Sequence, residues 1–276
     1  MTKKQSAVII KDDLGDTLEL DRVPSRIVSL IPSITETLFE LGAGSRVAGI
    51  TDYCIHPADA LAGIPKVGGT KGFSIDLVRD LSPDLAIANK EENRKPEIDA
   101  LRQVCPVFVS YPRTVEQAVK TILDLGTLTG RSAEASTMAA ECGSLLESIY
   151  PPVLGRPFRT VCFVWREPWI AVGRDTYVDD LFDTFGFKNV FAADDGRYPQ
   201  TSLEAVLDRG PEIVILPDEP YAFGPSDHTE VESFFAGRGS PVRVLRMDGT
   251  LITWFGYRTM LGIDHLRQVK TRLLAQ

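Results

Sequence analysis

The chain has 276 residues, of which 43% are hydrophobic and 25% are charged, as in an ordinary globular protein. Its formal net charge of −8 argues against a nucleic-acid partner, because such a partner selects a strongly basic face. This length lies near the size at which single hydrophobic cores stop growing, so we expect more than one domain.

The first residues carry no recognisable export signal. The segment MTKKQSAVIIKDD begins with basic residues but has no apolar core and no small-residue cleavage site. No later run approaches the ~20 apolar residues needed to span a bilayer. Two alternatives follow: the protein stays in the cytoplasm, or an export signal has been removed from it.

Strand and helix patterns alternate in the first part of the chain. Residues 7–20 are expected to form a hairpin around the turn DDLGD. The elements expected after it are strand 26–31, helix 33–41, strand 47–50, helix 96–104, strand 107–109 and a helix that opens at Thr114. Ser33 followed by Glu36 predicts a capping box at the first of these helices. The alternation predicts an α/β domain with a largely parallel sheet.

Residues 131–150 interrupt this alternation. Apolar side chains share one helical face there, with no strand pattern nearby, and they are Met138, Cys142, Leu145, Leu146 and Ile149. Twenty helical residues span roughly 30 Å. The segment is therefore expected either as a stiff strut between two lobes or as one more surface helix of the first lobe. The domain boundaries that follow are 1–130, 131–150 for the helix and 151–276.

The chain also contains an internal repeat. SIDLVRDLSPDLAIA at 74–88 aligns without a gap with SLEAVLDRGPEIVIL at 202–216, and Asp76 matches Glu204. Each copy has the pattern of a short helix, a turn marked by proline and a buried parallel strand. The second half is completed by an expected strand at 160–165, a helix at 176–185, a strand at 242–245 and a last helix at 257–275. Two similar lobes with a ligand cleft between them are predicted.

Candidate binding residues lie at the expected carboxyl ends of the strands, where open α/β sheets bind ligands. Aromatic rings and charges recur there in both halves, in TDYCIH at 51–56, NKEENR at 89–94, SY at 110–111, WREPW at 165–169, DEPY at 218–221 and in Trp254, Tyr257 and Arg258. This recurrence favours a ligand site over ordinary polar loops.

Catalytic and metal signatures are weak in this sequence. It contains no G-x-S-x-G elbow, no Walker loop and no H-E-x-x-H, so we expect a protein that is not an enzyme. Asp52, Cys54 and His56 stand at alternate positions and are the weak candidates for metal ligands. A turn whose side chains cap backbone amides is the favoured interpretation, and no intrinsic metal or cofactor is expected.

Five segments of the chain resemble a known family. They are RIVSLIPSITETLFELG, TDYCIHP, VGGTKGFSIDLVRDLSPDLAIANKEEN, VGRDTYVDDLF and GRYPQTSLEAVLDRGPEIVIL. Together they resemble the cobalamin- and ferric-siderophore-binding proteins of ABC importers, which belong to the helical-backbone metal receptor superfamily. The resemblance runs from about residue 15 to the end. It implies two Rossmann-like α/β lobes with mainly parallel sheets, joined by a long rigid backbone helix that residues 131–150 match.

The resemblance implies binding residues as well. Tyr53 and Tyr198 match aromatic positions around a corrin, and Trp165 and Trp254 lie close to others. Thr70 and Asn89 stand where the cobalamin-binding pattern has tryptophans. The basic residues nearby are Lys71, Lys90, Arg94, Arg166, Arg197 and Arg258. Such a basic, less aromatic site favours an anionic ferric chelate through charge-assisted hydrogen bonds.

The resemblance finally implies a partner and a location. One carboxylate on each lobe docks onto arginines of a membrane permease dimer, and these positions fall on Asp76 and Glu204. We therefore expect a monomeric, periplasmic or extracytoplasmic protein that captures a ferric siderophore or corrinoid and delivers it to a permease. The alternatives are a cytoplasmic metal-chelate binding protein and a metal chelatase on the same fold.

Overall fold

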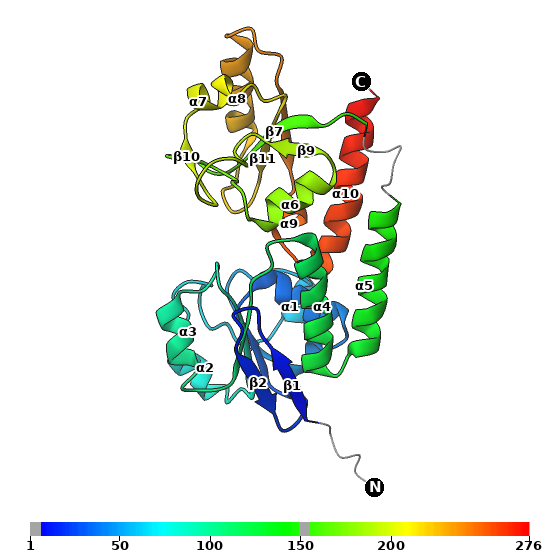
Figure 1. Cartoon of the computed structure of the whole chain (residues 1–276). Helices are drawn as coiled ribbons and strands as arrows, with labels where there is room; N and C mark the ends of the chain where they lie inside the picture. The colour runs from blue at the N-terminus through cyan, green and yellow to red at the C-terminus, as the bar shows by residue number, and fades with distance from the viewer. Residues whose placement is uncertain (1–6, 149–154, 276) are drawn as a thin grey trace. The chain divides into compact units, whose positions relative to one another are not determined.

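The computed structural model describes residues 7–148 and 155–275 (Figure 1). Its internal contacts divide the chain into two compact units. The first unit comprises the described residues up to Pro112, Glu116–Cys142 and Phe255–Tyr257, and the second comprises Arg113–Val115, Gly143–Trp254 and the chain from Arg258 on. Each unit has its own sheet. The boundaries at residues 130 and 150 stay predictions, and residues 149 and 150 of the expected helix lie outside the described part.

The first unit is built on a parallel sheet of four strands in the order β4-β3-β5-β6. Its strands are β3 (Ile27–Ser29), β4 (Val47–Ile50), β5 (Leu85–Asn89) and β6 (Val107–Ser110). Its helices are α1 (Pro32–Glu40), the 3-10 turns η1 (Gly44–Arg46) and η2 (Ala58–Leu61), α2 (Ile75–Asp80), α3 (Lys95–Leu101) and α4 (Val115–Thr129), whose first residue is counted with the second unit. The predicted hairpin is present as the antiparallel pair β1 (Val8–Lys11) and β2 (Thr17–Leu20).

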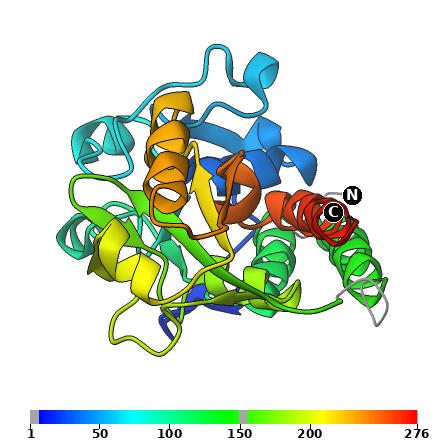
Figure 2. The same ribbon diagram turned by 90° about the horizontal axis from the view of Figure 1, so that it is seen from above.

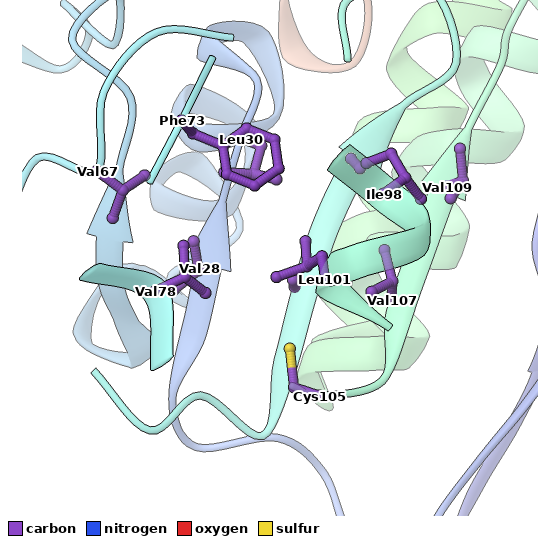
Figure 3. Close-up of a cluster of buried hydrophobic side chains, with 12 residues drawn as sticks. Val28, Leu30, Val67, Phe73, Val78, Ile98, Leu101, Cys105, Val107 and Val109 are labelled. Atoms are coloured by element: carbon purple, nitrogen blue, oxygen red, sulfur yellow. The ribbon is translucent and has the colours of Figure 1, made fainter. Parts of the chain in front are cut away.

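A cluster of buried apolar side chains fills one side of this sheet (Figure 3). Val28 on β3 and Val107 on β6 contribute from the strands, and Val78 on α2 and Leu101 on α3 contribute from the covering helices. All five residues of β5 are buried, as expected for a strand covered on both faces. The continuous apolar run LAIA is therefore explained by the position of β5 between β3 and β6.

The second unit is also a mainly parallel α/β unit. Its strands are β7 (Phe158–Trp165), β8 (Trp169–Ala171), β9 (Phe187–Asn189), β10 (Gln200–Thr201), β11 (Ile213–Pro217) and β12 (Arg243–Met247). β11 lies between β7 and β12, and β9 pairs with β7, all parallel, whereas β8 and β10 add antiparallel pairs. Its helices are α6 (Tyr177–Thr184), α7 (Leu203–Asp208), α8 (Pro225–Ala236), α9 (Thr250–Thr253) and α10 (Tyr257–Leu274), the last of which is seen from the side in Figure 1 and nearly end-on in Figure 2.

The segment that interrupts the alternation forms α5 (Ser132–Glu147). Ala135, Met138 and Cys142 are its buried residues and lie on one face, as the spacing predicts. The predicted capping box at Ser33 and Glu36 is wrong. α1 begins one residue earlier, at Pro32, and Ile31 occupies the N-cap position with no side-chain hydrogen bond. Proline is favoured in the first turn because its missing N–H is not needed there.

The internal repeat corresponds to the same local structure in each unit. Ser74 caps α2 by accepting a hydrogen bond from Leu77 N at 3.3 Å, and Ser202 caps α7 by accepting one from Ala205 N at 3.2 Å. The strand after each helix, β5 or β11, is the central strand between two parallel neighbours. Sequence identity in the repeat therefore reflects a duplicated helix–turn–strand unit.

An acidic residue in each repeat clamps the start of the neighbouring strand. Asp84 accepts hydrogen bonds from Ser25 N and Arg26 N at 2.9 Å, and the matching Glu212 accepts one from Arg159 N at 3.0 Å. The two arginines in turn donate to backbone carbonyls at the carboxyl end of α2 or α7. The clamps thus join helix, turn and strand in both units. Burial raises the pKa of Asp84, but the backbone hydrogen bonds from Ser25 and Arg26 outweigh it, and the pKa is lowered.

Substituting Asp84 by alanine is expected to lower the free energy of unfolding by about 1–3 kcal/mol, because two backbone donors lose a charged acceptor. The lowered pKa means that this contribution is complete above the ordinary value of 3.8 and is lost as the pH falls below it. Urea unfolding at pH 7 and pH 3 measures both effects. Asp80→Ala, which removes an exposed carboxylate from α2, is the control. Equal stability of the two variants at pH 7 would contradict the clamp.

Candidate functional site

The end of β5 carries a buried amide network that the sequence did not reveal. Asn89 is only 3% exposed, donates to Ser110 Oγ at 3.2 Å and accepts from Glu91 N at 2.8 Å. Asn93 accepts from Asn89 N at 2.8 Å and donates to the carbonyl of Thr70 at 2.7 Å. The side chains of Asn89 and Asn93 therefore tie this loop to β6 and to the backbone of Thr70. Asn89 and Thr70 stand at the expected tryptophan positions. Both are buried, and neither offers a broad stacking surface.

The exposed charges beside this network are of both signs. Lys71 and Lys90 are exposed, and Lys90 Nζ lies 4.2 Å from the centre of the Tyr111 ring. Glu91 and Glu92 follow directly. Their carboxylates make this edge less basic than Lys71, Lys90 and Arg94 alone suggest.

The turn after β4 is a polar turn and does not assemble a metal site. Cys54 is buried, with its Sγ atom 3.1 Å from Thr35 Oγ1 and 3.2 Å from Thr51 Oγ1. Asp52 is exposed. Across residues 7–148 and 155–275, no group of three His, Cys, Asp or Glu side chains is placed to hold a metal ion. This geometry agrees with the favoured interpretation of Asp52, Cys54 and His56 as parts of a turn, and it lends no support to the weak metal-ligand candidates.

Three of the four predicted aromatic residues are exposed. Tyr53 is 62% exposed, Trp165 44% and Tyr198 45%, unusually high values for large rings. Trp254 differs, because it is buried and its indole Nε1 donates to Glu219 Oε1 at 2.7 Å. Tyr53 lies in the first unit, and the other three lie in the second. Rings that face water at strand ends are available to a ligand without any rearrangement of a core.

The predicted basic residues of the second unit have partners in the protein. Arg166 forms ion pairs with Asp227 and, at 2.8 Å, with Glu230. Arg258 is buried and donates to Thr250 Oγ1 at 3.0 Å. Arg197 donates to the carbonyl of Asp175 at 2.6 Å. The hydrogen bond to Asp227 raises the pKa of Arg166, and the same contact helps to lower the pKa of Asp227 against the effect of burial. Each of these arginines therefore has a partner within the second unit, and its role in ligand binding stays a prediction.

The matched carboxylates of the repeat are exposed in both units. The side chain of Asp76 is 85% exposed in the first turn of α2, and that of Glu204 is 67% exposed in the first turn of α7. Asp76 forms an ion pair with Arg79 on its own helix, and Glu204 Oε1 lies 3.8 Å from Arg238 Nη2. Exposed pairs of this kind contribute little to stability and are easily exchanged for an external partner.

A hollow of about 260 Å³ lies at the opposite edge of the first sheet. It is lined by residues before β5 and β6 and around the end of β2, including Asp84 and Pro106. Asp84 is already engaged in the clamp. We therefore do not assign the binding site to this hollow.

The protein has two units with mainly parallel sheets, and exposed rings lie beside strand ends in both. These features are those of two-lobed α/β binding proteins. Residues 27–235 match the family described as periplasmic binding protein, and the chain belongs to this family.

Named relatives extend this result. The chain is 25% identical over 250 residues to a vitamin B12-binding protein of Vibrio cholerae, covering 90% of this chain and 88% of the relative. It is 25% identical over 271 residues to an uncharacterised ABC transporter substrate-binding lipoprotein, YvrC of Bacillus subtilis, covering 95% and 84%.

Solved structures show the same fold. A periplasmic vitamin B12-binding protein of Vibrio cholerae, BtuF, superposes with a TM-score of 0.78 at 20% identity, covering 92% of this chain and 99% of that one. A periplasmic heme-binding protein of Pseudomonas aeruginosa superposes with a TM-score of 0.77 at 21% identity, covering 90% and 93%. The predicted fold class is confirmed. Of the helices in the described ranges, none combines the length and apolar character that crossing a membrane requires.

Proposed function

We propose that this chain is the substrate-binding component of an ABC importer, which captures a metal–organic chelate and delivers it to a membrane permease. The observation that carries the proposal is the exposure of Tyr53, Trp165 and Tyr198 beside strand ends on a periplasmic binding protein fold. Relatives of this chain are named as vitamin B12-binding or heme-binding proteins, and this supports a large metal-containing ligand.

The proposed role is capture and release without chemical turnover. The named relatives are binding proteins, and this favours a binding role over a chelatase on the same fold. A protein that works in this way needs an accessible ligand surface and a second surface for its partner. We assign the ligand surface to the exposed rings, together with Lys71 and Lys90.

The partner surface is assigned to Asp76 and Glu204. They occupy the same place in the duplicated unit, both are exposed, and both begin a short helix. A permease built from two equal subunits presents the same basic patch twice, so one carboxylate from each unit suits it. We further propose that it works outside the cytoplasm, which the descriptions of the relatives as periplasmic or lipoprotein support, and that it is a monomer.

Ligand binding tests the proposal. We expect native mass spectrometry of protein purified from its own host to reveal a retained chelate. Titration with cyanocobalamin or haemin should quench the tryptophan fluorescence, because both probes absorb in the emission range. If neither probe binds and no chelate is retained, the proposed function is wrong.

The exposed rings are expected to contribute directly to affinity. Trp165→Ala and Tyr198→Ala should each weaken binding of the probe about 2- to 10-fold, which matches roughly 0.5–1.5 kcal/mol for a stacking contact beyond burial. Ile9→Ala, which removes an exposed apolar side chain from β1, is the control and should bind normally. Unchanged affinity in both ring variants would remove Trp165 and Tyr198 from the site.

A further inference from the structure

Each exposed carboxylate of the internal repeat has an arginine beside it in its own unit. In the first unit, Asp76 forms an ion pair with Arg79. In the second unit, Glu204 Oε1 lies 3.8 Å from Arg238 Nη2. All four residues are exposed, and we call each combination of one carboxylate and one guanidinium a charge couple.

The repeat itself supplies only one of these arginines. In the alignment that matches Asp76 with Glu204, Arg79 matches Leu207, which has no charge. Arg238 comes instead from the turn after α8, and α8 is a neighbour of α7 (Figure 1). The two units thus reach the same arrangement by different routes, within one helix in the first unit and between two elements in the second. Inheritance of the duplicated segment does not account for this agreement.

Stability does not account for it either. An exposed ion pair contributes little to folding, because water screens the charges and both side chains lose conformational freedom. Asp76 and Arg79 lie on one short helix, and the two atoms of the second couple are close to the longest distance at which an ion pair forms. Removing either arginine therefore leaves both cores intact, and the agreement between the units points to a role at the surface.

Arg238 is held in place by contacts other than that with Glu204. Its guanidinium carbon lies 3.6 Å from the centre of the Phe234 ring, and its Nη1 atom donates to the carbonyl of Phe234 at 3.1 Å. Phe234 in turn packs against the core of the second unit. A side chain that is already ordered loses little conformational entropy on binding, and arginine is enriched at protein interfaces. Arg238 is therefore a preformed contact group beside Glu204.

The charge couples restrict the chemistry of a partner. A partner surface that is only basic would approach each carboxylate against the repulsion of the neighbouring guanidinium. A surface that carries a basic group next to an acidic group attracts both members of the couple. Because each unit has one couple, a partner with two-fold symmetry can supply this complement twice.

We propose that Arg79 and Arg238 are docking residues for the permease, each acting with its neighbouring carboxylate, and that each permease subunit presents an acidic group next to a basic one. The proposal rests on the proposed function, because it concerns the partner surface assigned to Asp76 and Glu204. It adds a requirement that docking by carboxylates alone does not make, since loss of positive charge from this surface must weaken the complex.

The sign of the effect in Arg79→Gln with Arg238→Gln tests the charge couples. We expect the affinity for the permease dimer of the same host, held in lipid nanodiscs and measured by surface plasmon resonance, to fall about 10-fold. Arg79→Lys with Arg238→Lys keeps both charges and should retain most of the affinity. A partner that is only basic gives the opposite result, because removing two cations leaves the carboxylates unopposed. A rise in affinity, or no change, overturns the proposal.

The chain offers a matched control for these variants. Arg131 and Arg174 also form exposed ion pairs, one in each unit, with Glu134 at 3.0 Å and with Asp195 at 2.9 Å. Arg131→Gln with Arg174→Gln makes the same change in net charge and should bind the permease as the parent protein does. If this control loses as much affinity, net charge is responsible and the charge couples are not recognised.

The outcomes separate the charge couples from the role of the carboxylates. If Asp76→Ala with Glu204→Ala loses the complex while the glutamine variant keeps full affinity, the carboxylates dock alone and the present proposal is wrong. If the parent protein forms no complex with the permease, the proposed function and the charge couples fail together.

Discussion

Replacing both Asp76 and Glu204 by alanine is expected to abolish complex formation with the permease while leaving ligand affinity unchanged. Both carboxylates are exposed and begin matching helices, so their loss disturbs neither core. Removing one member of a desolvated interfacial charge pair costs about 2–5 kcal/mol, so two such losses weaken the complex by roughly a thousandfold or more. Co-purification with the permease in detergent measures the effect.

The chain offers a matched control for this experiment. Asp80 and Asp208 also correspond in the repeat, are exposed and end the same two helices. Asp80→Ala with Asp208→Ala makes the same change in net charge about one helical turn away in each unit. If this control loses complex formation as completely as the Asp76 and Glu204 variant, general charge attraction is responsible and the docking assignment is wrong.

Lys270→Met is expected to remove a rise in stability between pH 8 and pH 10.5. Lys270 is fully buried on α10, donates to the carbonyl of Arg156 at 2.8 Å and lies 4.3 Å from the centre of the Phe158 ring. Burial, with repulsion from Arg156, lowers the pKa of Lys270 to about 8, and Glu212 offsets only part of this effect.

The sign follows from the proton balance. Between pH 8 and the ordinary value of 10.5 the unfolded chain holds a proton on Lys270 that the folded protein has released. The free energy of unfolding therefore rises with pH in this window, by up to about 1.4 kcal/mol per pH unit. Below pH 8 the contribution of Lys270 to the free energy of unfolding does not change with pH.

Urea unfolding at pH 7, 8, 9 and 10 measures this rise in the parent protein and in Lys270→Met. Lys188→Met, which removes an exposed lysine from β9, is the control and should keep the rise. The free energy of unfolding of the parent protein is compared with that of Lys270→Met. If the difference does not increase across this window, Lys270 keeps its ordinary pKa and the prediction is wrong.

The fold was largely predictable because its signals are local. The alternating strands and helices, the repeat and α5 follow from apolar spacing that neighbouring residues provide. α8 was not predicted, because its sequence PSDHTEVESFFA begins with polar residues and buries only Asp227, Val231 and Phe235. Asp227 is buried because it pairs with Arg166, which lies 61 residues earlier.

The candidate site was less predictable, because its side chains pair with segments that are distant in the sequence. Arg166 and Arg258 have the right chemistry for an anionic ligand, but partners brought by the fold already occupy them. Trp254 is likewise buried by its hydrogen bond to Glu219, 35 residues away. Residue type and position near a strand end are visible in a sequence, whereas pairing between distant segments is not. Whether the exposed rings bind ligand stays a prediction.

The clamps formed by Asp84 and Glu212 have an evolutionary consequence. Both fasten the amino ends of their sheets, while Lys90 and Trp165, which are assigned to the ligand, lie at the carboxyl ends of β5 and β7. Mutations that change specificity therefore fall on loops that the clamps do not depend on. A lineage that descends from one duplicated unit can exchange these loops freely while inheriting the clamps unchanged, so new cargo can be acquired without first acquiring a new scaffold.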